Sequence, residues 1–162
     1  MSDGFLDSLS AQVGDLLLAK KMVVATAESC TGGGVAEIIT RTPGSSGWFE
    51  RGFVTYSNTS KHELLGIGTN ILECHGAVSR EVAEAMVSGA IKHSQAQAAL
   101  AITGIAGPDG GSDDKPVGTV WIAWQIRNND PVCKHFLFRG DRKQVRIQAC
   151  KEALQGLLKL LS

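Results

Sequence analysis

No charge of one sign predominates in this sequence. Its 162 residues carry 16 Lys and Arg against 16 Asp and Glu, so the formal net charge is zero. Because proteins that bind DNA or RNA usually carry a basic excess or stripe, this balance argues against a nucleic-acid partner. No apolar run approaches the ~18 residues that a membrane-spanning helix needs, so no association with a membrane is expected either.

An export signal is missing as well. Residues 1–7 are acidic and lack the basic segment and following apolar run of a signal peptide. The sequence contains no Cys-x-x-Cys pair, and its cysteines are widely spaced, at Cys30, Cys74, Cys133 and Cys150. Without an export signal, such cysteines are expected to be reduced and mostly buried. We therefore expect a cytoplasmic protein.

Several common site motifs are also absent. There is no Gly-x-x-x-x-Gly-Lys-Ser/Thr loop for a nucleoside triphosphate, and no Gly-x-Gly-x-x-Gly follows a predicted strand. A Gly-x-Ser-x-Gly nucleophile elbow is missing, which argues against an α/β-hydrolase. His62 and Glu63 begin like a zinc-protease motif, but the second histidine is missing, and neither Cys74 nor Cys133 has the partners of a zinc site. A metal site is therefore not expected.

Hydrophobic periodicity and turn residues predict alternating helices and strands. Strands are expected over 22–27, 52–56, 98–103, 118–126 and 132–138, with the last two forming a hairpin. Helices are expected over 5–20 and 35–40, after a capping box at Ser60, after Ser79 and after Asp141. Between the third and fourth strands, residues 104–118 contain five glycines and two prolines without periodicity, and irregular segments of this length are often functional.

These elements predict the fold class. Three strand-then-helix units followed by a hairpin indicate an α/β protein with a mixed sheet that helices cover on both faces. We expect a three-layer α/β/α sandwich whose mostly parallel sheet has about five strands. No repeat, linker or low-complexity tract interrupts the chain, so one domain over 1–162 is predicted.

The first candidate site residue is Ser29, which stands where a buried strand ends and a glycine-rich turn opens a helix. Such a turn directs several backbone N–H groups to one point, with the positive end of the helix behind them. The turn could therefore stabilise an oxyanion beside the serine hydroxyl, or bind a phosphate. Alternatively, Ser29 and Thr31 only cap the helix, and the loop alone does not decide between the two interpretations.

A serine nucleophile needs a base, and Lys61 is the candidate. It falls at the first position of the helix predicted after Ser60, where the helix dipole disfavours an ammonium, but too weakly to deprotonate it. Partial burial would have to add to this effect. Tyr56, the only tyrosine, ends a strand, where sites gather in open α/β sheets, and its phenol could relay a proton. Alternatively, Lys61 is a solvated surface residue and Tyr56 only packs.

Two arginines near the C-terminus could bind an anion. Arg142 and Arg146 stand four residues apart on the first turns of the last predicted helix. Together with the helix N-terminus they could hold a phosphate. A solvated face or a contact between subunits is the alternative, and the sequence slightly favours it.

Four strings of the sequence resemble a known family: TAESCTGG (26–33), GSSGWFERGFVTYSN (44–58), HGAVS (75–79) and TGIAGPDGGSDDKPVGTVW (103–121). They are similar to the nicotinamide-nucleotide amidase family, which is the C-terminal domain of the competence/damage-inducible CinA proteins and also occurs as a stand-alone bacterial enzyme. The similarity runs from about residue 5 to the C-terminus. The strings are long and unusual enough to make chance similarity very improbable.

The resemblance implies hydrolysis of the carboxamide of nicotinamide mononucleotide, giving nicotinate mononucleotide and ammonia, in pyridine nucleotide salvage. It implies no metal and no cofactor, a three-layer α/β/α fold, and a homo-oligomer, expected to be a dimer. Family members use a serine, a tyrosine and a lysine that match Ser29, Tyr56 and Lys61. The remaining expected oxyanion or substrate contacts are Cys30, Thr31, Gly32, Gly33, Thr103, Gly104, Arg142 and Arg146.

This sequence departs from the family pattern in two respects. Gly34 stands where some relatives carry a bulkier residue, so the rim of the site is expected to differ. The resemblance covers only the C-terminal domain of the longer CinA proteins, so the pyrophosphatase activity associated with their N-terminal domain is not expected.

Three alternatives remain open at this point. The chain could be a nucleotide-binding or regulatory module without turnover, although the presence of Ser29, Tyr56 and Lys61 argues against that. It could be an amidase that acts on another small amide. Finally, Cys30 is a rival nucleophile, because it is adjacent to Ser29 and could be activated by the same helix end.

Overall fold

The computed structural model describes residues 2–162; Met1, the first residue of the domain expected over 1–162, lies outside the described residues. The helices are α1 (Asp3–Lys20), α2 (Gly34–Thr40), α3 (Asn58–Leu65), α4 (Thr69–His75), α5 (Arg80–Lys92) and α6 (Arg142–Leu161), with a single 3₁₀ turn at Ser45–Gly47. The strands are β1 (Val24–Glu28), β2 (Phe49–Val54), β3 (Ala98–Gly104), β4 (Thr119–Ile126) and β5 (Val132–Leu137).

The five strands form one mixed sheet in the order β2-β1-β3-β4-β5. Strand β1 pairs in parallel with both β2 and β3, whereas β4 pairs antiparallel with β3 and with β5. Four of the five strands therefore point in the same direction, and only β4 opposes them. This arrangement confirms the predicted mixed, mostly parallel sheet.

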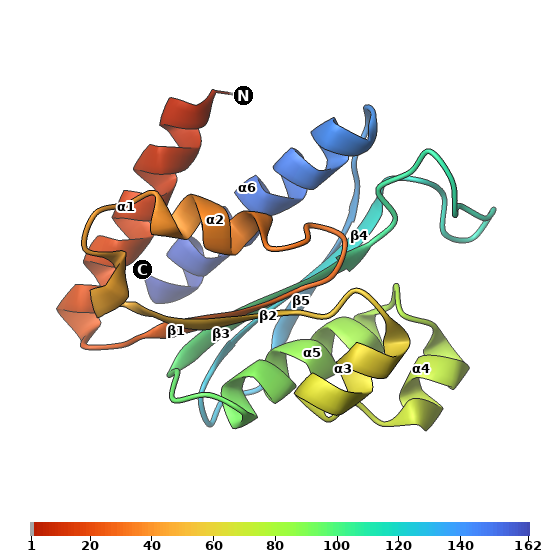
Figure 1. Ribbon diagram of the computed structural model, residues 1–162, viewed down its shortest axis with the longest axis horizontal. Helices are drawn as coiled ribbons and strands as arrows, with labels where there is room; N and C mark the ends of the chain where they lie inside the picture. Colours follow the sequence, from red (N-terminus) through yellow and green to blue (C-terminus); the bar gives the residue numbers. More distant parts are fainter. Residues whose placement is uncertain (1) are drawn as a thin grey trace.

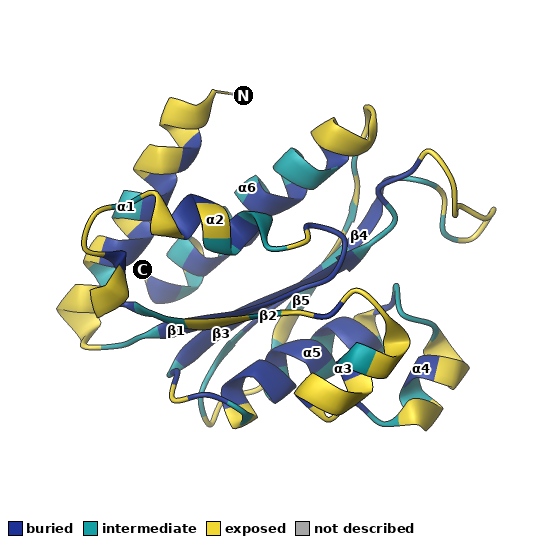
Figure 2. Ribbon diagram, in the orientation of Figure 1, coloured by how far each residue is buried: buried dark blue, intermediate teal, exposed yellow. Residues whose placement is uncertain are grey.

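Helices cover both faces of the sheet and complete the three predicted layers. Helices α1, α2 and α6 lie on one face, and α3, α4 and α5 lie on the other (Figure 1). The buried sides of these helices face the sheet, as the dark ribbon in Figure 2 shows. Within residues 2–162, none of the helices combines the length and the apolarity needed to cross a membrane.

Alternation along the central strands gives the two faces different side chains. In β3, Leu100 and Ile102 point into the core beneath α1, α2 and α6, whereas Ala99 and Ala101 point into the core beneath α5. Successive residues of a strand face opposite sides, so every residue of a doubly covered strand must be apolar or paired. The alanines let α5 approach the sheet closely, and the larger residues fill the wider layer on the opposite face.

Several boundaries differ from the predicted ones. The first two strands were expected over 22–27 and 52–56, but β1 is Val24–Glu28 and β2 is Phe49–Val54. The predicted start of α3, after a cap at Ser60, is also wrong. The helix is capped by Ser57, and the side chains of Ser57 and Ser60 form the capping box. Helix α4 is not among the predicted elements, because its N-cap is Gly68, which has no side chain to signal a helix start.

Other starting points are confirmed. Ser79 caps α5 and accepts a hydrogen bond from the Val82 N–H at 3.2 Å. Asp141 caps α6 and forms a capping box with Gln144. The predicted hairpin corresponds to β4 and β5, which pair from Thr119 with Leu137 to Trp124 with Val132.

Candidate active site

Three loops meet where the parallel strands β1, β2 and β3 end. They place Ser29, Tyr56 and Thr103 around one pocket of about 280 Å³, with Lys61 from α3 and Arg142 from α6. Since the carboxyl ends of parallel strands lie at the same edge of a sheet, loops distant in sequence converge there. The structure therefore brings the three residues of the expected Ser, Tyr and Lys set into a single pocket.

Backbone hydrogen bonds fix Ser29 at the bottom of this pocket. Its N–H donates to the Ile102 carbonyl of β3 at 3.0 Å, and the Thr55 N–H donates to the Glu28 carbonyl just before it at 2.9 Å. Only 9% of Ser29 is exposed. The backbone of Ser29 is accordingly held from both sides, and its hydroxyl does not cap α2, whose N-cap is Gly33 without a side-chain hydrogen bond.

The side chain of Lys61 is buried against this hydroxyl. Its Nζ donates to Ser29 Oγ at 3.0 Å and to the Thr55 carbonyl at 2.9 Å, and the residue is 2% exposed. The interpretation of Lys61 as a solvated surface residue is therefore wrong. Burial disfavours the charged ammonium and lowers the pKa of Lys61 below its ordinary value of 10.5.

The position of Lys61 in α3 also changes the reason for that pKa. Because Ser57 is the N-cap, Lys61 is the fourth helical residue and not the first, and its N–H already bonds the Ser57 carbonyl at 3.1 Å. The electrostatic effect of a helix end is confined to its first turn, so it acts only weakly on a side chain that leaves the helix here. Desolvation is the main cause of the lowered pKa.

Cys30, the rival nucleophile, lies beside Ser29 but is poorly suited to attack. Burial, together with the negative charge of Glu28, raises the pKa of the Cys30 thiol to about 11. The thiol is therefore protonated near neutral pH, and only a thiolate is an effective nucleophile. All four cysteines are free; Cys30 and Cys150 are buried, Cys133 is partly buried and Cys74 is exposed.

Tyr56 lies at the mouth of the pocket and is 60% exposed, two residues beyond the end of β2. Its hydroxyl accepts a hydrogen bond from Arg142 Nη2 at 2.8 Å, and Arg142 Nη1 donates to the Gly107 carbonyl at 2.7 Å. Among the described residues, its hydroxyl has no hydrogen bond to Ser29 or Lys61. Arg142 thus joins the β2 loop, the glycine-rich segment and α6 on one side of the pocket.

The glycine turn after Ser29 has the left-handed backbone that its sequence suggests. Gly32 and Gly33 have φ angles of 60° and 97°, which residues with a Cβ rarely adopt. The Gly32 N–H donates to the Ser29 carbonyl at 2.9 Å and so tightens the turn. Of the predicted contacts in this loop, Cys30 lines the pocket, whereas Thr31, Gly32 and Gly33 lie outside its lining.

Thr103 and Gly104 both line the pocket, as expected. Thr103 Oγ1 donates to the Ala77 carbonyl at 2.8 Å and so holds the segment before α5. A Cβ on Gly104 would stand 2.7 Å from a methyl group of Val120 and 2.9 Å from the Thr119 carbonyl, so this position has no room for a side chain.

Arg146 does not lie in the pocket, contrary to the expected phosphate contact. Its Nε donates to the Cys30 carbonyl and its Nη2 to the Thr31 carbonyl, both at 3.1 Å. These atoms belong to the back of the loop, and Arg146 lines a separate cavity of about 260 Å³ there. Arg142 and Arg146 are one helical turn apart, yet Arg142 lines the pocket and Arg146 contacts the opposite side of the loop.

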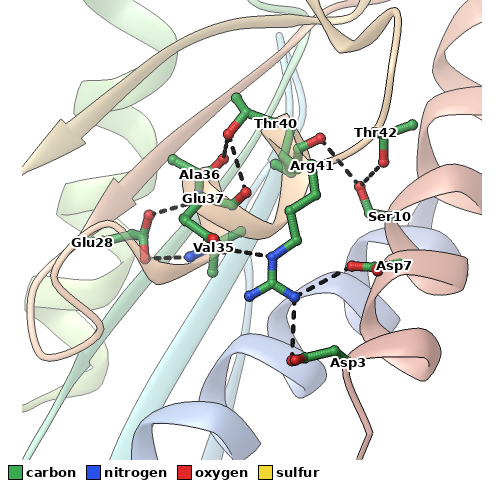
Figure 3. Close-up of polar contacts among 11 residues, drawn as sticks. Asp3, Asp7, Ser10, Glu28, Val35, Ala36, Glu37, Thr40, Arg41 and Thr42 are labelled. Atoms are coloured by element: carbon green, nitrogen blue, oxygen red, sulfur yellow. Dashed lines mark hydrogen bonds and ion pairs between the residues drawn. The ribbon is translucent and has the colours of Figure 1, made fainter.

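Glu28 directly precedes the serine and was not among the predicted site residues. Its buried carboxylate accepts hydrogen bonds from Thr31 Oγ1 at 2.6 Å, the Val35 N–H at 2.9 Å and the Ala36 N–H at 3.1 Å. The carboxylate thus caps the free N–H groups of α2 from the end of β1, as Figure 3 shows. An acidic residue at the end of a buried strand was the available signal, because buried charges are nearly always paired.

Asn58 and Asp109 also line the pocket without having been predicted. Asp109 belongs to the glycine-rich segment and supplies the only acidic side chain in the lining that the described residues form. No group of three or more His, Cys, Asp or Glu side chains comes together anywhere within residues 2–162 in a way that could hold a metal ion.

A serine, a tyrosine and a lysine that share one site are also what the family resemblance implies. The family model for the CinA C-terminal domain matches residues 6–161, nearly the whole chain. The chain belongs to the CinA C-terminal domain family. Two relatives of this CinA domain are 52% identical, and both are named nicotinamide-nucleotide amidohydrolase PncC.

The relative from Escherichia coli K12 aligns over 157 residues, which is 97% of this CinA domain and 95% of the relative. The one from Pseudomonas putida aligns over 155 residues and covers 96% of each chain. Among solved structures, the competence/damage-inducible protein CihA from Agrobacterium tumefaciens superposes with a TM-score of 0.96 at 40% identity. The superposition covers 100% of this chain and 98% of the Agrobacterium chain.

Proposed function

We propose that this protein hydrolyses the carboxamide of nicotinamide mononucleotide to nicotinate mononucleotide and ammonia, a reaction of pyridine nucleotide salvage. The observation that carries the proposal is the 3.0 Å hydrogen bond between Ser29 Oγ and the buried Nζ of Lys61. Burial lowers the pKa of Lys61, so the amine can lose its proton and act as a base. The two relatives named amidohydrolases support the same reaction.

In this mechanism, neutral Lys61 takes the hydroxyl proton of Ser29 as the serine oxygen attacks the carboxamide carbon. The carbonyl electrons move to the oxygen, and the resulting oxyanion is stabilised by backbone N–H groups of the loop after Ser29. The C–N bond then breaks, and Lys61 returns its proton to the departing ammonia. Water hydrolyses the acyl-enzyme by the same steps and releases nicotinate mononucleotide.

Direct proton transfer to Lys61 is supported over a relay through Tyr56. The amine is already within hydrogen-bond distance of Ser29, whereas the phenol bonds Arg142. We assign Arg142 to the substrate, because its guanidinium can bind the phosphate. The phenol of Tyr56 then orients that guanidinium. The cationic pyridinium ring makes the amide more electrophilic, and a neutral lysine beneath it avoids repulsion.

The test is release of ammonia from nicotinamide mononucleotide by the purified protein, with nicotinamide and its riboside as comparisons. We expect turnover of the mononucleotide and poor use of the other two amides. Binding of the mononucleotide without ammonia release would instead indicate a nucleotide-binding module. Preference for an unrelated small amide would retain the serine chemistry and reject the substrate.

A further inference from the structure

Arg146 forms hydrogen bonds to the back of the loop that carries Ser29. Its guanidinium donates to two successive carbonyl groups, those of Cys30 and Thr31, each at 3.1 Å. None of the ion pairs formed within residues 2–162 involves Arg146, so its charge faces peptide oxygens alone. A side chain from the last helix therefore helps to fix the orientation of two peptide groups of this loop, and the Gly34 N–H, which donates to the Thr31 carbonyl at 2.9 Å, contributes to the second.

Because of the geometry of the peptide bond, this contact also determines where the neighbouring N–H groups point. In a planar trans peptide, the C=O and N–H groups point to opposite sides. When Arg146 holds the Cys30 carbonyl, the Thr31 N–H must point away from the guanidinium. When it holds the Thr31 carbonyl, the Gly32 N–H must do the same.

The Gly32 N–H donates to the Ser29 carbonyl at 2.9 Å. Because the Cys30 N–H lies opposite that carbonyl in the Ser29–Cys30 peptide, it points the same way as the Gly32 N–H, away from Arg146. No backbone carbonyl among the described residues accepts a hydrogen bond from the N–H of Cys30 or of Thr31. Two donors without a carbonyl partner thus follow the serine, in a loop that Arg146 holds from behind together with the backbone hydrogen bonds of the turn.

We propose that Arg146 is a positioning residue that holds the turn after Ser29 so that the N–H of Cys30, which lines the pocket, faces the oxyanion formed when Ser29 attacks. The inference rests on the proposed amidase function. The guanidinium does not touch the substrate. It acts by fixing the turn, and with it the donor, before the reaction.

The first experiment measures ammonia release by the wild type and by Arg146→Met, which keeps an extended side chain without donors. Since removal of one oxyanion donor lowers kcat by ~10²–10³-fold, we expect a fall of about 10- to 1000-fold. KM should change by less than about threefold, because ground-state binding does not use the oxyanion donors. Arg146→Lys keeps the charge without the planar fork of donors, so its kcat should lie between that of the wild type and that of Arg146→Met.

Lys143→Met is the matched control. Lys143 stands on the same helix and lines the same cavity behind the loop, but it has no hydrogen bond to the loop in the described structure. Its kcat should stay within about twofold of the wild-type value. Circular dichroism and Tm establish that each variant is folded, and if Arg146→Met does not fold, Arg146→Lys serves as the test variant.

A second measurement separates oxyanion stabilisation from a general loss of structure. The aldehyde analogue, pyridine-3-aldehyde mononucleotide, accepts Ser29 Oγ on its carbonyl carbon. A C–O bond forms while the C=O π bond opens, the carbonyl oxygen receives the electron pair, and the hydroxyl proton passes to Lys61. This adduct needs the oxyanion donors but has no leaving group. We expect its inhibition constant to rise across the Arg146 variants in proportion to their loss of kcat/KM.

Three results would overturn the inference: unchanged kcat in both Arg146 variants, a loss of kcat/KM that lies entirely in KM, or an unchanged inhibition constant despite a lower kcat. If the wild type releases ammonia, any of these results in the variants would leave the proposed function intact. A wild type that releases no ammonia from nicotinamide mononucleotide would overturn the proposed function, and the inference with it.

Discussion

The hydrogen bond between Ser29 and Lys61 is the residue-scale feature on which the proposed chemistry depends. We predict that Ser29→Ala abolishes ammonia release while the protein stays folded, because the backbone hydrogen bonds that anchor residue 29 remain and only the hydroxyl is lost. Ammonia release and circular dichroism of the purified variant provide the measurement. Comparable turnover in the folded variant would remove Ser29 as the nucleophile.

Cys30→Ala is the control for that variant. The thiol is buried and its pKa is raised to about 11, so it should contribute little to attack. Ammonia release should therefore survive in Cys30→Ala and resist thiol alkylation. If these two treatments abolish activity while Ser29→Ala does not, the cysteine is the nucleophile.

The pH dependence tests Lys61 directly. As the base, Lys61 must be neutral, so kcat/KM should rise tenfold per pH unit and level off at the lowered pKa of Lys61, below 10.5. Arginine keeps the charge but does not deprotonate in this range, so we predict that Lys61→Arg is nearly inactive at every accessible pH. A Lys61→Arg variant with the wild-type rate and pH profile would refute the lysine base.

The sequence could predict the identities of these residues but not their surroundings. A serine before three glycines and a lysine near a helix start are local patterns. The burial of Lys61 is not local, because it depends on the Thr55 carbonyl and on the loop after β1. For this reason the sequence offered mainly the helix dipole as a cause for a lowered pKa of Lys61, whereas the structure supports desolvation as the main cause.

At the scale of elements, the N-terminus of α3 sets the position of Lys61. Ser57 Oγ accepts from the Ser60 N–H at 3.0 Å, and Ser60 Oγ accepts from the Ser57 N–H at 3.1 Å. We predict that Ser57→Ala lowers the free energy of unfolding by about 1 kcal/mol, as measured by urea denaturation. Thr59→Ala, at an exposed position of the same turn, should change it by less than about 0.5 kcal/mol.

That capping box also shows why the predicted boundary was wrong. Both Ser57 and Ser60 are good N-cap residues, and the spacing from Ser60 to Glu63 fits a capping box as well as the true one does. Only the tertiary structure chooses between them, and there Ser57 is the N-cap. Helix α4 posed the opposite difficulty, since a glycine cap gives no side-chain signal.

At the scale of the whole molecule, the pocket exists only when four distant segments come together. Arg142 joins three of them through Tyr56 and Gly107, which lie 86 and 35 residues away in the sequence. No local pattern reports contacts of that range, which explains why Arg142 and Arg146 were treated alike although they lie on different sides of one loop. The order of elements, by contrast, was sufficient to predict the three layers.

The assignment of Arg142 to the phosphate gives a prediction about selectivity. A charge-assisted hydrogen bond contributes ~1.5–3 kcal/mol, so Arg142→Met should lower kcat/KM for the mononucleotide by about 10- to 150-fold. The same variant should affect the riboside, which lacks the phosphate, much less. Arg139→Met, at an exposed position just before α6, is the control for loss of a nearby charge. Equal losses for both substrates would exclude phosphate recognition by Arg142.

The burial of Lys61 has a consequence for the folding equilibrium of the whole chain. Its pKa is about its ordinary 10.5 when the chain is unfolded and lower when it is folded, so between the two values the unfolded chain binds more protons. The free energy of unfolding should therefore rise with pH across that window, by up to ~1.4 kcal/mol per pH unit from this group. Below the lowered pKa, both states carry the charge, and the full penalty of burying it remains.

Lys61→Met isolates this contribution because methionine does not titrate. In urea denaturation at a series of pH values from neutral to 10, the difference in free energy of unfolding between the two proteins should shift in favour of the wild type as the pH rises. A difference that does not vary with pH would contradict a lowered pKa. Within the window, the folded chain is the stronger acid at this group, so each molecule that folds releases a proton from Lys61 to the solvent and arrives with its proposed base already neutral.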